Sequence, residues 1–75
     1  MNASEIIKEL IRFRGWSQSI LAEKAGFKSQ SNITGILNNS KGGIKIDNLV
    51  KLAGAMGCEV IIRDTMGSKK EWVIK

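Results

Sequence analysis

The stretch SQSILAEKAGFKSQSNITGIL, residues 17–37, decides how this chain folds. Its first part carries apolar residues about one helical turn apart, at Ile20, Leu21 and Ala25. Its second part carries apolar residues at the spacing i, i+3, i+4, at Ile33, Ile36 and Leu37. Gly26 lies between the two patterns and readily adopts the left-handed conformation that ends a helix. The stretch therefore predicts two short helices, the second over about residues 29–38, joined by a tight turn.

The outer face of the second predicted helix is almost free of charge and rich in small hydrogen-bonding groups. These groups belong to Gln30, Ser31 and Thr34. A helix that faces only water usually carries charged residues on this side. Amide and hydroxyl groups instead suit a helix that lies against the donors and acceptors of base edges in a DNA groove. Taken one at a time, each of these residues fits a solvated surface equally well.

The charge of the chain is concentrated around this helix. The net charge is +5, and no acidic residue occurs between Glu23 and Asp47. The same window contains four basic residues: Lys24, Lys28, Lys41 and Lys45. Such a positive region attracts phosphates, and the attraction weakens as salt is added. The alternative is that these lysines serve solubility alone.

Length and composition narrow the class of protein. Seventy-five residues, 43% of them hydrophobic, are enough for one domain with a small core. The chain has no apolar run that spans a membrane and no signal-like N-terminus, so we expect a cytoplasmic protein without a membrane partner. It has no His, one Cys and scattered acids, so we expect neither an enzyme nor a metal or cofactor site.

Two further helices flank the central stretch. Residues 4–14 predict one, with Ser4 as N-cap and Gly15 as its end. Its apolar stripe consists of Ile6, Ile7, Leu10 and Ile11, and we expect Phe13 to close that stripe. Residues 46–56 predict the other, which Gly57 ends; its stripe consists of Leu49, Leu52, Ala53 and Met56, widened by Ile46 and Val50. Ser17 and Ser29 are the expected N-caps of the two central helices, and we expect Phe27 to be buried between helices.

The pattern then changes to the alternation of β-strands. Residues 58–64 and 69–75 predict two strands of a hairpin. We expect Ile62 and Trp72 to face the helices, which leaves Ile61 and Val73 on the outside. Because an isolated hairpin is marginally stable, this outer apolar face predicts a dimer interface. The alternative is that both residues are simply exposed at an edge.

A resemblance to the lambda-repressor/Cro-like helix-turn-helix family, also called XRE-type, is carried by SQSILAEKAGF, QSNITGILNN and IDNLVKLAGAMGC, which begin at residues 17, 30 and 46. The resemblance covers roughly residues 4–58. The chain departs from the family pattern in a turn after Gly26 that is one residue longer. It also has Gly35 and Leu37 where the family often has a long polar residue and a Glu.

The resemblance implies a mainly α fold, a four-helix lambda-repressor-like DNA-binding domain over residues 1–57 with a C-terminal β-hairpin over residues 58–75. It implies a small transcriptional regulator, a repressor, that binds double-stranded DNA sequence-specifically with the second motif helix in the major groove. Cro-like members can dimerise through a C-terminal strand, so we expect a homodimer. The alternative is a protein-interaction module on the same scaffold, for example an antitoxin that covers a toxin.

Roles for individual residues follow from the resemblance and from the docking geometry of such motifs. The expected base contacts are Gln30, Ser31 and Thr34. The expected contacts with the DNA backbone are Gln18, Lys28, Asn32, Asn38, Lys41 and Lys45. The expected dimer contacts are Ile61 and Val73.

Overall fold

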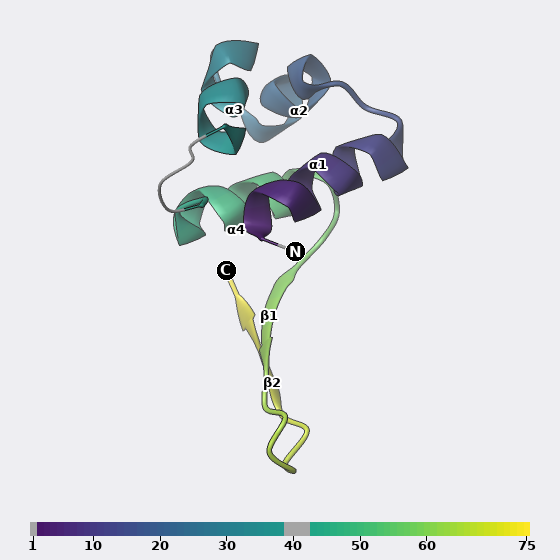
Figure 1. Cartoon of the computed structure of the whole chain (residues 1–75), viewed down its shortest axis with the longest axis vertical. Coiled ribbons are helices and arrows are strands. Elements are labelled where there is room, and N and C mark those ends of the chain that lie inside the picture. Colours follow the sequence, from purple (N-terminus) through teal and green to yellow (C-terminus); the bar gives the residue numbers. More distant parts are fainter. Residues whose placement is uncertain (1, 39–42) are drawn as a thin grey trace.

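The computed structural model describes residues 2–38 and 43–75. Within them the elements follow in the order α1 Ala3–Arg14, α2 Gln18–Ala25, α3 Gln30–Leu37, α4 Ile46–Ala55, β1 Val60–Arg63 and β2 Glu71–Ile74. The four helices gather into one body, and the two strands form a hairpin that projects from it (Figure 1). The predicted fold class, mainly helical with a C-terminal antiparallel hairpin, is confirmed.

The N-terminus of α1 is capped by Asn2, so the prediction of Ser4 as N-cap is wrong. The Asn2 side chain accepts a hydrogen bond from the Glu5 amide at 2.9 Å, and the Glu5 carboxylate accepts one from the Asn2 amide at 3.4 Å. This reciprocal capping box leaves Ser4 inside the first turn. Its hydroxyl instead donates to the carbonyl of Leu37 at the end of α3, 2.5 Å away.

The other predicted helix ends agree with the structure. Ser17 caps α2 by accepting a hydrogen bond from the Ile20 amide at 3.1 Å. Ser29 precedes α3, and its amide donates to the side-chain oxygen of Asn32 at 3.2 Å. Gly15 and Gly26 end α1 and α2 in the left-handed conformation, with φ of 72° and 81°. A residue with a Cβ would be strained at either position.

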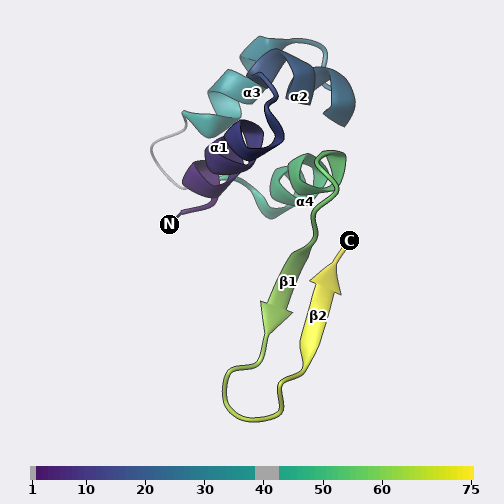
Figure 2. The ribbon, with the colours of Figure 1, turned by 90° about the vertical axis from the view of Figure 1, so that its right-hand side faces the viewer.

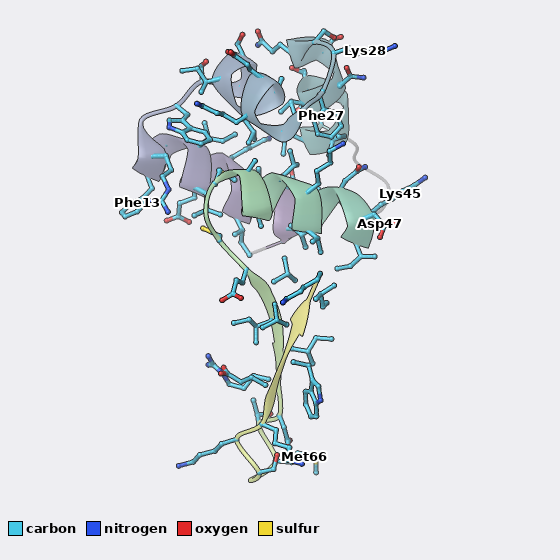
Figure 3. All side chains as sticks on the ribbon, turned by 180° about the vertical axis from the view of Figure 1, so that it is seen from behind. Phe13, Phe27, Lys28, Lys45, Asp47 and Met66 are labelled. Carbon is cyan, nitrogen blue, oxygen red and sulfur yellow. The ribbon has the colours of Figure 1, made fainter. Side chains whose placement is uncertain are left out.

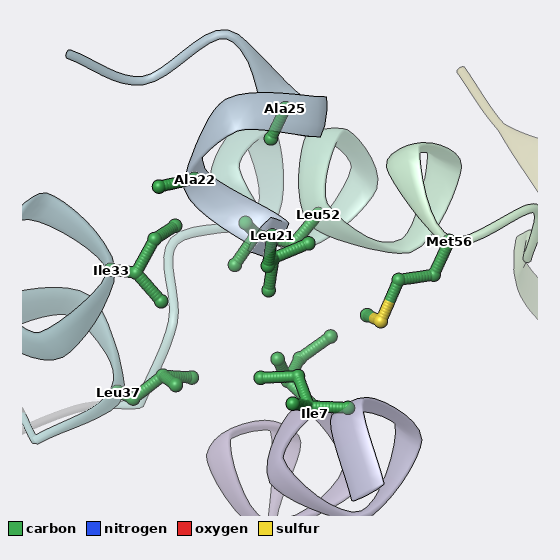
Figure 4. Close-up of a cluster of buried hydrophobic side chains, with 9 residues drawn as sticks. Ile7, Leu21, Ala22, Ala25, Ile33, Leu37, Leu52 and Met56 are labelled. Carbon is green, nitrogen blue, oxygen red and sulfur yellow. The ribbon is translucent and has the colours of Figure 1, made fainter. Parts of the chain in front are cut away.

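The core is confined to the helical body and takes one fully buried side chain from each helix. These are Ile7, Leu21, Ile33 and Leu52. Other members of the same cluster include Ala22, Ala25, Leu37 and Met56, and they point toward the same centre (Figure 4). Phe27 is half-buried against this cluster, as expected, and the Lys51 ammonium lies 4.6 Å from the centre of its ring. The pairwise packing of helices thus fixes α3 from its inner side.

Three predicted members of the apolar stripes lie outside the core. Phe13 is 78% exposed, and Ile6 and Ile46 are also exposed. Phe13 follows the buried Ile11 by two residues, which turns it about 200° around the helix axis and onto the outer face. The prediction that Phe13 closes the stripe is therefore wrong.

The hairpin, called the arm below and taken as residues 58–75, stands away from the helices (Figure 2). Its strands are antiparallel, with Ile62 opposite Trp72 and Ile61 opposite Val73. Ile62 is 57% and Trp72 54% exposed, so the prediction that they face the helices is wrong. The chain leaves α4 at the left-handed Gly57 and then runs outward, so only the base of the arm, where β1 begins and β2 ends, lies close to the body.

The turn at the tip of the arm holds an ionised carboxylate, which gives a pH prediction. Hydrogen bonds from the Ser68 hydroxyl and then from the Met66 amide lower the pKa of Asp64 below 3.8. The folded turn favours the charged form of Asp64. The contribution of this carboxylate to stability is therefore complete above about pH 3.8 and is lost as the pH falls through the lowered pKa.

In an NMR titration, the Met66 amide resonance is expected to shift with a midpoint below 3.8, the ordinary value for Asp. Replacing Ser68→Ala should return the midpoint toward that value, because the first of the two donors is removed. A midpoint at or above 3.8 in the unsubstituted chain would contradict this description of the turn.

Candidate nucleic-acid interface

Helix α3 occupies the end of the molecule opposite the arm, and its N-terminus points away from the arm (Figure 1). Ile33 and Leu37 anchor its inner face in the core. Its C-terminal carbonyl at Leu37 receives the hydrogen bond from Ser4 of α1. The helix is therefore held at both its inner face and its C-terminal end, while its outer face stays open.

The open face carries the residues that the sequence singled out first. Gln30 and Ser31 in the first turn are both exposed. Ser31, Gly35 and Asn38 follow at i, i+4 and i+7, and all three are exposed. A row at this spacing lies along one side of a helix. The structure thus brings together an uncharged, polar surface on α3 that is free to contact another molecule.

Thr34 is placed differently from Gln30 and Ser31. It is half-buried, and its hydroxyl donates a hydrogen bond to the side-chain oxygen of Gln18 at 2.9 Å. Gln18 is the first residue of α2. This bond joins the N-terminus of α2 to the middle of α3 and fixes the orientation of the Gln18 amide. The two residues are 16 positions apart, so no local pattern in the sequence signals their pairing.

The remaining predicted contact residues surround this surface. Lys28 lies in the turn before α3 and Lys45 directly before α4, and both side chains reach into solvent (Figure 3). Asn32 and Asn38 are exposed, although the Asn32 oxygen is engaged in capping α3. Lys41 lies outside the described residues.

The charge around α3 is less uniform in space than along the sequence. Glu5 and Lys8 of α1 line a hollow beside Asn38 at the C-terminal end of α3. Asp47 lies in the first turn of α4, next to Lys45 (Figure 3). The stretch without acids in the sequence is therefore flanked by acids in the fold. Among the residues that the structure describes, Lys28 makes the N-terminal end of α3 the more positive of its two ends.

Comparison with known protein families identifies the motif formed by α2, the turn and α3. A family model described as helix-turn-helix matches residues 7–61, which include α2, the turn at Gly26 and α3. The chain belongs to the XRE-type helix-turn-helix family, the Cro and lambda-repressor-like class. The matched range ends at Ile61, halfway along β1, and β2 lies beyond it. Searches of curated proteins and of solved structures gave no match.

Membership in this helix-turn-helix family makes the chain a DNA-binding regulatory protein. In the motif, α2 is the first helix and α3 is the second. None of the helices in the described part of the chain has the length and apolar character needed to cross a bilayer.

Proposed function

We propose that this helix-turn-helix protein is a cytoplasmic repressor of transcription that binds double-stranded DNA sequence-specifically, with α3 in the major groove. It acts by binding and not by catalysis. The observation that carries the proposal is the exposed, uncharged surface formed by Gln30, Ser31, Gly35 and Asn38 on a helix anchored by Ile33 and Leu37. An α-helix fits the major groove, where each base pair presents its own pattern of donors and acceptors.

The proposed contacts divide into base readers and backbone holders. Gln30 and Ser31 enter first, because the N-terminal turn of such a helix contacts base edges. A glutamine amide pairs with two atoms of adenine, and a serine hydroxyl pairs with several bases. Thr34 offers the bases its methyl group and the lone pairs of its hydroxyl oxygen, because its hydroxyl hydrogen is already donated to Gln18.

The phosphate contacts lie around that surface. With its oxygen held by Thr34, the Gln18 side chain presents its amide nitrogen as the donor for a phosphate. Lys28 and Lys45 are exposed and charged, and they approach the backbone from different sides of α3. Asn32, Asn38 and Lys41 complete the proposed set. Contacts of this kind position the protein but carry no sequence information of their own.

The proposal includes a homodimer joined through the arm, the element formed by residues 58–75. Ile61 and Val73, the contact residues expected from the sequence, are each 42% exposed. A two-fold dimer places its two reading helices about 34 Å apart, one turn of DNA, on a near-palindromic site.

Selection of bound duplexes from a random DNA pool tests this proposal. We expect enrichment of one motif with two related half-sites whose centres are about 10 base pairs apart. Affinity for the selected site should fall steeply as salt rises, because phosphate contacts release counterions. Failure to enrich any sequence, with binding that does not respond to salt, would contradict the proposal.

Gly35 provides a second test, because it lies on the open face of α3. A Cβ placed there would meet no atom of the described residues within 4 Å. Gly35→Ala is therefore expected to stabilise the fold by up to about 1 kcal/mol, through helix propensity. We also expect it to weaken DNA binding, because the added methyl group stands between α3 and the groove.

Gly54→Ala is the matched control, since Gly54 is an exposed helical glycine of α4 with equally open surroundings. It should raise the melting temperature in a similar way and leave DNA affinity unchanged. Equal DNA affinity of the Gly35→Ala chain and the unsubstituted chain would remove Gly35 from the proposed interface.

A second candidate function is a protein-interaction module of the antitoxin type, which covers another protein such as a toxin. The projecting arm with its exposed apolar side chains favours this candidate. The two functions are compatible, because they use opposite ends of the molecule. DNA binding by the isolated chain separates them: a chain that binds no duplex without a second protein would favour the interaction module.

A further inference from the structure

Among the residues that the structure describes, two side-chain hydrogen bonds tie α3 to the neighbouring helices. The Thr34 hydroxyl donates to the side chain of Gln18 on α2, near the middle of α3. The Ser4 hydroxyl of α1 donates to the main-chain carbonyl of Leu37, the last residue of α3. The two bonds come from different helices and act at different points along one short helix, so together they define the direction in which α3 points.

The Ser4 hydroxyl is free for this contact because another residue caps α1. Asn2 occupies the N-cap position and accepts the hydrogen bond from the Glu5 amide. Ser4 therefore lies inside the first turn, where a serine hydroxyl commonly bonds to its own backbone or points to solvent. Here it reaches a residue 33 positions away. The capping box thus leaves one hydroxyl of α1 available to α3.

The carbonyl of Leu37 depends on this partner. The last four carbonyls of an α-helix have no amide to accept from within the helix. The bond from Ser4 is partly buried, and a carbonyl that loses its partner in such a place lowers stability. Beside it, a hollow of about 350 Å³ is lined by Glu5 and Lys8 of α1 and by Asn38. Side chains do not fill this side of the helix end, so Ser4 makes the connection that packing does not.

Apolar packing does not by itself fix the tilt of α3. Ile33 and Leu37 are buried and point into the core, which sets how close α3 lies to the body (Figure 4). Apolar contacts have no preferred direction, so the tilt of the helix is left to the hydrogen bonds. Gln30 lies about 6 Å along the helix from Thr34, so a tilt of about 10° about Thr34 moves Gln30 by about 1 Å. A binding site has to hold its contact groups to within about 0.5 Å.

We infer that Ser4 is a positioning residue for DNA recognition. It lies on α1, outside the proposed contact surface, and acts through the Leu37 carbonyl by holding the tilt of α3. This inference rests on the proposed function, in which Gln30 and Ser31 read the bases. Because the tilt is set before binding, no binding free energy is spent on setting it. Base contacts need that tilt, whereas phosphate contacts do not carry sequence information, so Ser4 contributes to the selected site and not to random DNA.

The direction of α3 in the free protein tests the structural part of this inference. Residual dipolar couplings of the backbone amides report the direction of each helix in solution. In Ser4→Ala, which removes the hydroxyl and keeps a good helix former, we expect α3 to tilt relative to α4 by about 10° or more, enough to move Gln30 by about 1 Å. Ser4→Thr retains the hydroxyl and should retain the direction of α3.

Ser68→Ala is the matched control for the loss of a serine hydroxyl. Ser68 also donates a hydrogen bond, to Asp64 in the turn of the arm, far from α3. Its replacement should leave the direction of α3 unchanged. If α3 keeps its direction in Ser4→Ala as well, the inference is overturned, whether or not the protein binds DNA.

Fluorescence anisotropy with the selected duplex and with random duplexes tests the part that concerns recognition. Ser4→Ala should weaken binding to the selected duplex about threefold to tenfold, the equivalent of one hydrogen bond. Binding to random duplexes should weaken less than about twofold, because phosphates hold those duplexes. Ser4→Thr should restore the affinity for the selected duplex. Each variant is measured well below its melting temperature, which removes any difference in stability from the comparison.

Two results of the binding experiment would overturn the recognition role of Ser4. Equal weakening of both kinds of duplex would show that Ser4 only stabilises the fold. Unchanged affinity of Ser4→Ala for the selected duplex would show that the tilt of α3 does not matter for reading. An unsubstituted chain that binds no duplex would refute the proposed function and this role together. The direction of α3 in Ser4→Ala is measured without DNA, so the two failures are distinguishable.

Discussion

Ile33→Ala is expected to lower the free energy of unfolding by about 2–5 kcal/mol, measured by chemical denaturation. Ile33 is fully buried and comes from α3, where it contacts the cluster formed by all four helices. Its truncation removes apolar contacts and leaves a cavity that the small core fills only in part. Because a domain of this size has little stability to lose, part of the population should be unfolded at 37 °C.

Ile46→Ala is the matched control for this loss. Ile46 is also a helical isoleucine, but it is 49% exposed at the start of α4. Its replacement should change the free energy of unfolding by less than about 1 kcal/mol. Similar losses in the two variants would contradict the assignment of Ile33 to the core and, with it, the anchoring of α3.

Gln30→Ala is expected to weaken binding to the selected DNA site by about 1–3 kcal/mol, about fivefold to 150-fold in affinity. Gln30 is the first residue of α3 and is exposed, so its removal should leave folding unchanged. Its amide is the side chain best suited to pair with two atoms of one base. Binding to random duplexes should stay the same, because those duplexes are held through phosphates. Fluorescence anisotropy with both kinds of duplex measures the difference.

Lys45→Ala distinguishes the two kinds of contact. This side chain is exposed beside α3 and is proposed to hold a phosphate. Its loss should weaken binding to the selected and to the random duplexes by the same factor, and it should reduce the salt dependence of binding. If Gln30→Ala and Lys45→Ala both lower the affinity for the two duplexes equally, the proposed division between base readers and backbone holders is incorrect.

Local sequence patterns predicted the helical part of this fold well, because its elements are marked by short-range chemistry. The apolar spacing of Ile33 and Leu37, and the glycines at 15 and 26, act within one or two helical turns. The capping box between Asn2 and Glu5 is equally local and was missed only because Ser4 offered a competing cap.

Contacts between distant residues could not be predicted in this way. The hydrogen bond from Ser4 to Leu37 spans 33 positions, and that from Thr34 to Gln18 spans 16. Both depend on how the helices pack, which periodicity within one helix does not reveal. The orientation of the arm was missed for a related reason. Alternation identified the two faces of the hairpin but not that the arm stands away from the helical body, so that Ile61, Ile62, Trp72 and Val73 are all exposed.

Mapping a bound duplex onto the chain by amide chemical shifts tests directly whether α3 is the element that contacts DNA. We predict the largest changes at Gln30, Ser31 and Gly35 on α3 and at the N-terminus of α2, with small changes at the tip of the arm around Met66. The changes should diminish as salt is added, because phosphates supply much of the affinity. Changes concentrated on the arm, with α3 unaffected by the duplex, would contradict the proposal that α3 lies in the major groove.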